Sequence, residues 1–137
     1  MSESITPLSI MLIVGDELDS ELASFEFSAA GYTVSVPTDH QLAVEESLKV
    51  IPDVVFIDIT LPDRAAYDIA RRLGSSPDMA SAWLVALGVD DNPGTHALAS
   101  EARFLFKCGK KAQFSDLLRI VKAKEKLGRE RAERKSD

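Results

Sequence analysis

Cysteine is nearly absent from this sequence, and so are long hydrophobic runs. The only cysteine, Cys108, excludes an internal disulfide and is typical of a protein from a reducing compartment. No apolar stretch approaches the roughly 20 residues that a membrane helix needs, and the N-terminus has no basic segment followed by an apolar one. These absences predict a cytoplasmic protein without membrane insertion.

Positive charge is scarce except near the C-terminal end. The net charge is −6, yet residues 122–137 hold seven Lys or Arg against four Asp or Glu, which makes that segment +3 and leaves −9 for residues 1–121. An acidic body repels phosphate backbones and attracts cations. Direct binding of nucleic acid by the body is therefore not expected.

The composition is otherwise that of an ordinary globular domain. Hydrophobic residues make up 45% of the 137 residues and charged residues 28%, so the chain can bury a core without metal or disulfide crosslinks. We expect one domain over residues 1–123. Residues 124–137 are charged all round and contain Gly128, which fits either a helical extension or a solvated tail.

Apolar segments of strand length alternate with amphipathic ones along the chain. This alternation predicts a parallel sheet with right-handed crossovers and helices on both faces. The expected fold is a flavodoxin-like doubly wound α/β domain with strand order 2-1-3-4-5. The five expected strands cover residues 8–14, 32–36, 54–58, 82–87 and 104–107. The third strand, Val54 to Asp58, has the continuous apolar run of a strand buried on both faces.

The helices expected between these strands have apolar residues at helical spacing. A capping-box pattern at residues 38–41 opens the second helix, and the fourth helix, limited to residues 95–100, looks unusually short. The apolar positions are Leu18, Leu22, Phe25 and Ala29 in the first helix, Leu42, Val44 and Leu48 in the second, Ala66, Ile69, Ala70 and Leu73 in the third, and Phe114, Leu117, Leu118 and Val121 in the fifth.

Residues that could carry chemistry follow the carboxyl ends of the expected strands. Asp16 follows the first strand, Asp58 ends the third, Gly88 ends the fourth and Lys107 ends the fifth. Strands one and three are neighbours at the switch point of this strand order, which puts Asp16 beside Asp58. Two close carboxylates repel each other unless a cation such as Mg²⁺ lies between them. Lys107 would supply a positive charge for an anion near Asp58.

Three motifs stand out in this arrangement: Ile-Met-Leu-Ile-Val-Gly-Asp-Glu at 10–17, Val-Val-Phe-Ile-Asp-Ile-Thr-Leu-Pro at 54–62, and Phe-Leu-Phe-Lys at 104–107. Together they resemble the receiver domain of bacterial two-component response regulators, over about Ser9 to Val121. The resemblance implies a signalling protein and not an enzyme. It also implies a histidine kinase or phosphotransfer protein as phosphoryl donor and a further protein as downstream partner.

The resemblance also implies roles for individual residues. Asp58 would accept a phosphoryl group as an acyl phosphate, and Lys107 would contact the phosphoryl oxygens. Mg²⁺ would be held by Asp58 together with Asp16 and the backbone carbonyl of Thr60, with Glu17 as a further candidate ligand. Phe104 would occupy the aromatic switch position.

Several residues depart from the family pattern. Gly15 replaces the first acid of a pair, so weak Mg²⁺ binding is expected. Gly88 replaces a Thr or Ser whose hydroxyl contacts the phosphoryl group, which weakens coupling to the aromatic switch. Cys108 replaces a proline that follows a cis peptide; because a cis bond before another residue costs about 3 kcal/mol, we expect a trans bond and a displaced Lys107. Residues 64–66 lack the usual Asp-Gly.

Three function classes therefore remain in view. The first is a stand-alone response-regulator receiver that accepts phosphate on Asp58 and signals through protein contacts. The second is a phosphorylation-independent pseudo-receiver that works as a protein interaction module. The third, a small flavin- or nucleotide-binding protein or a phosphatase-like enzyme, is disfavoured because the turns after strands one and four lack a Gly-rich or Ser/Thr-rich phosphate cradle.

Overall fold

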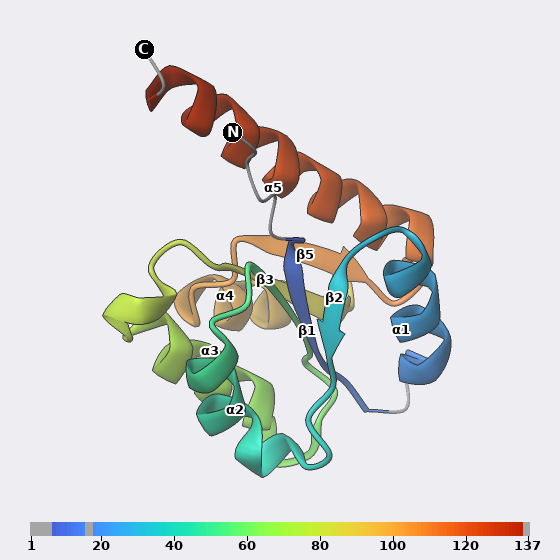
Figure 1. The fold of residues 1–137 in the computed structure, drawn as a ribbon. Helices are drawn as coiled ribbons and strands as arrows, with labels where there is room; N and C mark the ends of the chain where they lie inside the picture. The colour runs from blue at the N-terminus through green and yellow to red at the C-terminus, as the bar shows by residue number, and fades with distance from the viewer. Residues whose placement is uncertain (1–6, 16–17, 136–137) are drawn as a thin grey trace.

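A five-stranded parallel sheet forms the centre of the molecule, with helices on both faces (Figure 1). This computed structural model describes residues 7–15 and 18–135, with side chains to residue 132. The strand order is β2-β1-β3-β4-β5, which confirms the predicted order 2-1-3-4-5 and the doubly wound α/β class.

The elements of the described chain follow one another as alternating strands and helices, with short 3₁₀ helices at His40–Leu42, Pro62–Arg64 and Pro77–Met79. The strands are β1 (Ser9–Ile13), β2 (Thr33–Ser35), β3 (Val54–Asp58), β4 (Trp83–Val89) and β5 (Phe106–Gly109). The α-helices are α1 (Ser20–Ala29), α2 (Ala43–Val50), α3 (Ala65–Gly74), α4 (Pro93–Glu101) and α5 (Phe114–Lys135).

Strand β3 is buried along its whole length, as its apolar run predicted. Val55 and Ile57 face a core shared with α2, α3 and α4. Val54 and Phe56 face a second core, shared with α1 and α5. The two-sided burial fixes which way each residue of β3 points and brings Asp58 to the carboxyl end of the sheet.

Helix α1 buries a different face from the one predicted. Ala23 and Phe27 are buried, whereas Leu22 is 54% and Phe25 71% exposed. The physical reason is aromatic packing: the Phe27 ring stacks on Phe56, with centroids 6.0 Å apart, and approaches another ring on α5. That contact outweighs the burial of the other apolar stripe of the helix.

Helix α2 also departs from the prediction, because it buries Val44 but exposes Leu42 and Leu48. The predicted capping box does not form. Instead Asp39 accepts a hydrogen bond from the backbone N–H of Gln41, at 2.9 Å, and the chain enters α2 through a 3₁₀ turn. The buried face of α2 thus consists of small side chains beside Val44. These are Ala43 and Ser47.

Helix α3 buries the predicted residues, and Tyr67 in addition. Helix α4 is longer than predicted, with nine residues from Pro93 to Glu101. Asn92 begins it by accepting a hydrogen bond from the N–H of Gly94 at 2.7 Å, and Pro93 is favourable in the first turn. The expectation of an unusually short fourth helix was therefore wrong.

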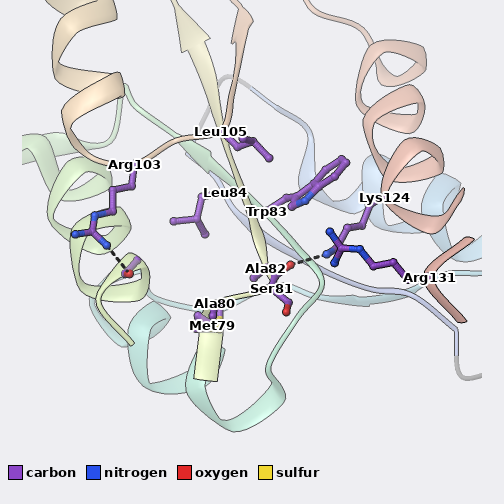
Figure 2. Close-up of a pocket in the computed structure, with 11 residues that line it drawn as sticks. Met79, Ala80, Ser81, Ala82, Trp83, Leu84, Arg103, Leu105, Lys124 and Arg131 are labelled. Atoms are coloured by element: carbon purple, nitrogen blue, oxygen red, sulfur yellow. Dashed lines mark hydrogen bonds between the residues drawn. The ribbon is translucent and has the colours of Figure 1, made fainter. Parts of the chain in front are cut away.

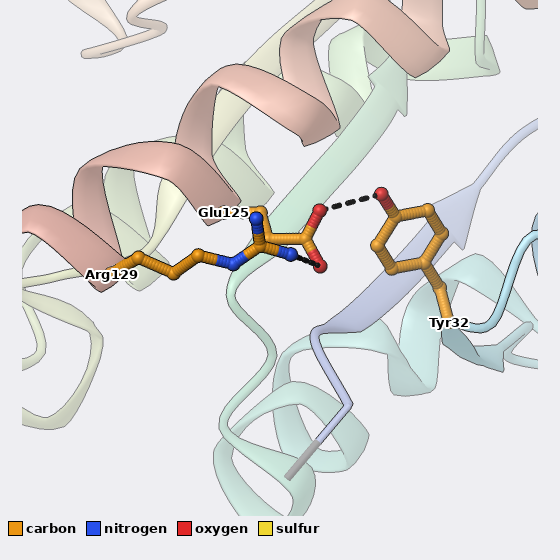
Figure 3. A network of polar contacts seen from close by, with 3 residues as sticks. All are labelled: Tyr32, Glu125 and Arg129. Atoms are coloured by element: carbon orange, nitrogen blue, oxygen red, sulfur yellow. Dashed lines mark hydrogen bonds and ion pairs between the residues drawn. The ribbon is translucent and has the colours of Figure 1, made fainter. Parts of the chain in front are cut away.

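Helix α5 is a continuous helix of 22 residues whose last turns extend beyond the sheet (Figure 1). The Tyr32 hydroxyl donates to Glu125 Oε1 at 3.0 Å, and Glu125 also pairs with Arg129 at 3.4 Å (Figure 3). On its other side, Lys124 donates to the Ser81 carbonyl. These contacts tie α5 to the segments before β2 and before β4.

None of the helices in the described ranges has the length and apolar character needed to cross a membrane.

Replacing Phe27 with alanine should lower the free energy of unfolding by about 3–5 kcal/mol, because the aromatic ring is fully buried between two neighbouring rings. The matched control Phe25→Ala removes an equal ring that is largely exposed, and should change stability by less than about 0.5 kcal/mol. Urea unfolding of both variants measures the difference. Equal losses would contradict the burial described for α1.

Burial and the hydrogen bond to Glu125 raise the pKa of the Tyr32 phenol above its ordinary value of 10.0. The neutral phenol therefore stabilises the fold below pH 10, and this contribution is lost as the pH rises through the higher folded-state pKa. Tyr32→Phe should cost about 1 kcal/mol at neutral pH and flatten the decline of stability above pH 10. Unfolding curves from pH 8 to 11 test this, and an unchanged slope would contradict it.

Candidate functional site

Asp58 is the last residue of β3 and its side chain is 0% exposed. Oxygen Oδ1 accepts hydrogen bonds from the Thr60 N–H at 2.8 Å and from the Thr60 hydroxyl at 2.6 Å. Oxygen Oδ2 accepts a longer bond from the Gly15 N–H at 3.3 Å. The carboxylate thus has donors on both oxygens, all from the loops that follow β1 and β3.

Two glycines pack closely against this carboxylate. A Cβ atom on Gly88 would lie 3.3 Å from both Asp58 Oδ1 and Thr60 Cγ2, and one on Gly15 would lie 3.5 Å from Asp58 Oδ2 and 3.3 Å from Leu61 Cδ2. Gly88 also has φ of +78°, which side-chain-bearing residues rarely adopt. The two glycines leave little room for a side chain over Asp58.

Gly88 does not end its strand as predicted. Strand β4 continues through it to Val89, and the pairing with β5 shifts register between Ala86 and Val89. The left-handed backbone of Gly88 accompanies this shift. Consequently the position predicted to lack a hydroxyl is part of the sheet and lies against the carboxylate of Asp58.

Lys107 lies within β5 and not at its end, because β5 begins at Phe106 and continues to Gly109. Its ammonium group donates to the Ser100 hydroxyl on α4 at 2.7 Å. Lys107 forms no ion pair with Asp58 in the structure, and every peptide bond of the described residues is trans. The positive charge predicted for the site is therefore directed toward α4.

Phe104 and Cys108 lie on opposite faces of the sheet. Phe104 precedes β5 and is buried in the core that contains α4. Cys108 is buried in the core with α1 and α5, where burial raises the pKa of its thiol and Asp116 adds to the effect. A thiol with a raised pKa in an apolar core is a poor nucleophile.

Asp16 and Glu17, the predicted partners of Asp58 in binding Mg²⁺, lie outside the described residues. Gly15, directly before them, has its N–H at the Asp58 carboxylate, so the loop that carries the two acids starts beside Asp58. Within the described parts of the chain, no three His, Cys, Asp or Glu side chains form a group that could hold a metal ion. Metal binding at this end of the sheet thus remains a prediction that depends on Asp16 and Glu17.

The side chain of Thr60 was missed by the sequence analysis, which assigned a role only to its backbone carbonyl. The structure shows that its hydroxyl and its N–H both bind Asp58 Oδ1. Such a bond between an acid and the residue two positions later is a common turn arrangement. The Asp-x-Thr sequence after the strand could have indicated it.

Neither a protein-family model nor a curated protein matches the sequence. Solved structures do match its fold. One is the receiver domain of a signal transduction histidine kinase from Syntrophus aciditrophicus, with a TM-score of 0.75 and 19% identity over 85% of this chain and 88% of that one. Another is the chemotaxis protein CheY4 of Vibrio cholerae, with a TM-score of 0.74 and 16% identity over 86% of this chain and 98% of that one. The fold is that of a receiver domain. This confirms the resemblance at the level of the fold.

A third similar structure is the receiver domain of a sensor histidine kinase from Pseudomonas aeruginosa, with a TM-score of 0.74 and 19% identity over 86% of this chain and 97% of that one. That protein is described with a magnesium ion coordinated in its active site cleft. In the receiver fold of the present chain, Asp58 takes the end of the central strand, beside Gly15 after β1, Thr60 after β3 and Gly88 within β4.

Gly88→Ala should destabilise the protein more than Gly31→Ala. Both glycines have positive φ, but a Cβ on Gly31 would meet nothing within 4 Å, whereas one on Gly88 would crowd Asp58 and Thr60. The left-handed backbone alone costs an alanine about 1–2 kcal/mol, and the crowding should add about 1–3 kcal/mol at Gly88. Thermal and urea unfolding measure both; equal losses would show that the space over Asp58 is not confined.

Proposed function

We propose that this chain is a receiver-fold signalling module that acts through protein contacts, with Asp58 as a structural acid and not a phosphoacceptor. The observation that supports this most is the complete burial of the Asp58 side chain among donors from its own protein. Phosphoryl transfer needs a carboxylate oxygen in line with the phosphorus of the donor. In the described conformation neither oxygen is open to such an approach.

The electrostatic support for phosphoryl transfer is also weak. Charge on a transferring phosphoryl group is normally balanced by cationic side chains, metal ions and hydrogen-bond donors aimed at it. Here the Lys107 ammonium is bound to Ser100 on α4, and Gly88 contributes no hydroxyl. Both observations favour the pseudo-receiver hypothesis over the phosphorylated one.

Phosphorylation of Asp58 is the second candidate function, and one observation favours it. Asp58 lies at the carboxyl end of a central strand, at the switch point where open α/β sheets bind their ligands. On this alternative, a histidine kinase or phosphotransfer protein would supply the phosphoryl group. Asp16, Asp58 and the Thr60 carbonyl, with Glu17 as a further candidate, would hold Mg²⁺ weakly, while Lys107 would contact the phosphoryl oxygens.

The second candidate requires two rearrangements of the described residues. The Thr60 hydroxyl would have to leave Asp58 Oδ1, and the Lys107 ammonium would have to leave Ser100. The Thr60 bond is made to a buried carboxylate, and such bonds typically contribute about 1.5–3 kcal/mol. The Lys107 bond is exposed, so water can replace Ser100 at a smaller cost. The first candidate requires neither step.

Beryllofluoride with Mg²⁺, followed by amide NMR, distinguishes the two functions. For the wild-type protein we expect no Mg²⁺-dependent shifts at residues 58–61 and 86–89, and no incorporation of phosphate from acetyl phosphate on a phosphate-affinity gel. Asp58→Asn is the matched control because it keeps the size of the side chain. Shifts or incorporation in the wild type that Asp58→Asn abolishes would overturn the proposal in favour of the phosphoacceptor.

Thr60→Ala tests whether the Thr60 hydroxyl prevents phosphoryl transfer to Asp58. If the hydroxyl on Oδ1 is what prevents the reaction, this variant should gain a response to beryllofluoride that the wild type lacks, since Oδ1 then loses its closest donor.

A further inference from the structure

Figure 2 shows the residues that line a pocket of about 380 Å³. The pocket includes Trp83 at the start of β4, so it lies at the end of the sheet opposite to Asp58, which ends β3. Its walls are the connection from α3 to β4, the start of β4, the turn between α4 and β5, and one side of α5. A smaller pocket of about 150 Å³ adjoins it and shares Trp83, Lys124 and Arg131. A volume of this size suits a small ligand.

Three positive side chains line the larger pocket. They are Arg103, Lys124 and Arg131, and no acidic residue lines it. The polar partners of the first two are neutral: Arg103 donates to the Gly74 carbonyl at 3.0 Å and Lys124 to the Ser81 carbonyl. Among the described residues, none of the three forms an ion pair with a carboxylate. In the described part of a protein with net charge −6, three cations thus line one pocket without an ion pair to any of them.

The environment of Lys124 also contains uncompensated positive charge. Burial lowers the pKa of its ammonium group, Asp53 opposes this effect, and Arg131 lowers the pKa further. Asp53 lines only the smaller pocket, and its carboxylate already accepts a hydrogen bond from the Ser9 N–H at 2.8 Å. An anion in the larger pocket would offset the repulsion between Lys124 and Arg131.

Arg103 follows the end of α4, and its side chain is held against the end of α3 by the bond to the Gly74 carbonyl. Its φ is +72°, which is unusual for a residue with a side chain, and its Cδ atom would be 3.0 Å from a Cβ on Gly74. Gly74 thus lets the arginine side chain lie flat against the end of α3. The left-handed backbone at Arg103 ends α4, with the Phe104 N–H donating to the Ala99 carbonyl at 3.3 Å, as is common where helices terminate.

Between the cations the pocket is apolar. Figure 2 shows Arg103 on one side and Lys124 with Arg131 on the other, with Leu84 and Trp83 between them. The Lys124 ammonium lies over the Trp83 ring, 5.4 Å from its centroid, and a second aromatic ring packs against Trp83. The Trp83 ring is therefore not free to stack on a ligand. Recognition therefore depends on charge at two separated points.

We propose that this pocket binds a compact polyanion with two or more phosphate or carboxylate groups. Lys124 and Arg131 bind one anionic group, and Arg103 binds the other. Arginine guanidinium and lysine ammonium groups are the usual protein partners of both kinds of anion. Because Arg103 belongs to the α4–β5 turn while the other two belong to α5, the ligand connects these two elements.

The test uses the full chain and the fluorescence of Trp83, which is the only tryptophan. Inorganic pyrophosphate and ATP represent phosphate ligands, and citrate represents carboxylate ligands, each titrated in 150 mM NaCl and checked by calorimetry. We expect saturable one-to-one binding of at least one probe. Binding of pyrophosphate or ATP alone identifies a phosphate ligand, and binding of citrate alone identifies a carboxylate ligand.

Charge-removing variants locate the site. Arg131→Gln and Arg103→Gln should each weaken binding about tenfold, while Arg119→Gln, an equal charge change at an exposed position of α5 outside the pocket, should leave it unchanged. Arg131 is exposed, so its replacement should not affect folding. The proposal is overturned if no probe binds below millimolar concentration, or if Arg119→Gln weakens binding as much as Arg131→Gln does.

Discussion

The burial of β3 on both faces is the constraint on which the rest of the structure depends. One core lies between this strand and α2, α3 and α4, and the other between it and α1 and α5. At its start, Asp53 holds the strand in register, because its side chain accepts from the Ser9 N–H and its carbonyl from the Trp83 N–H. With the strand fixed in this way, the position of Asp58 at the carboxyl end of β3 is fixed as well.

The buried position of Asp58 sets the stability of the fold against the reactivity of the carboxylate. A buried carboxylate is costly unless hydrogen bonds replace the water it has lost. Thr60 and Gly15 supply those bonds, and the glycines at 15 and 88 let the backbone approach closely enough to cover the oxygens. On the function proposed here, the same close packing that compensates the buried charge also keeps a phosphoryl donor away from Asp58. A receiver fold can therefore keep its central acid for structural reasons alone.

Sequence patterns predicted the alternation of strands and helices, the course of β3 and the buried face of α3, because each of these follows from one regular hydrophobic pattern. The strand order was expected from the flavodoxin-like fold class and is confirmed. They failed for α1, where two apolar stripes compete and the contact of Phe27 with Phe56 decides between them. They also failed for the limits of β5, whose pairing with β4 shifts register. The trans peptide bond before Cys108 and the displacement of Lys107 from Asp58 were, by contrast, expected from the missing proline. The basic pocket could not be predicted from the sequence, because its three cations come from segments that only the fold brings together.

The two outer strands of the sheet have a further consequence, for association between copies of the protein. Strand β2 has three residues and β5 has four, and the ladder of β5 is interrupted by its register shift. Short or irregular edges offer a second chain few unpaired backbone groups, which is how natural sheets avoid joining edge to edge. The sheet is thus poorly suited to grow into a larger one. The exposed apolar side chains of α1, Leu22 and Phe25, lie on a helix surface and not at an edge of the sheet.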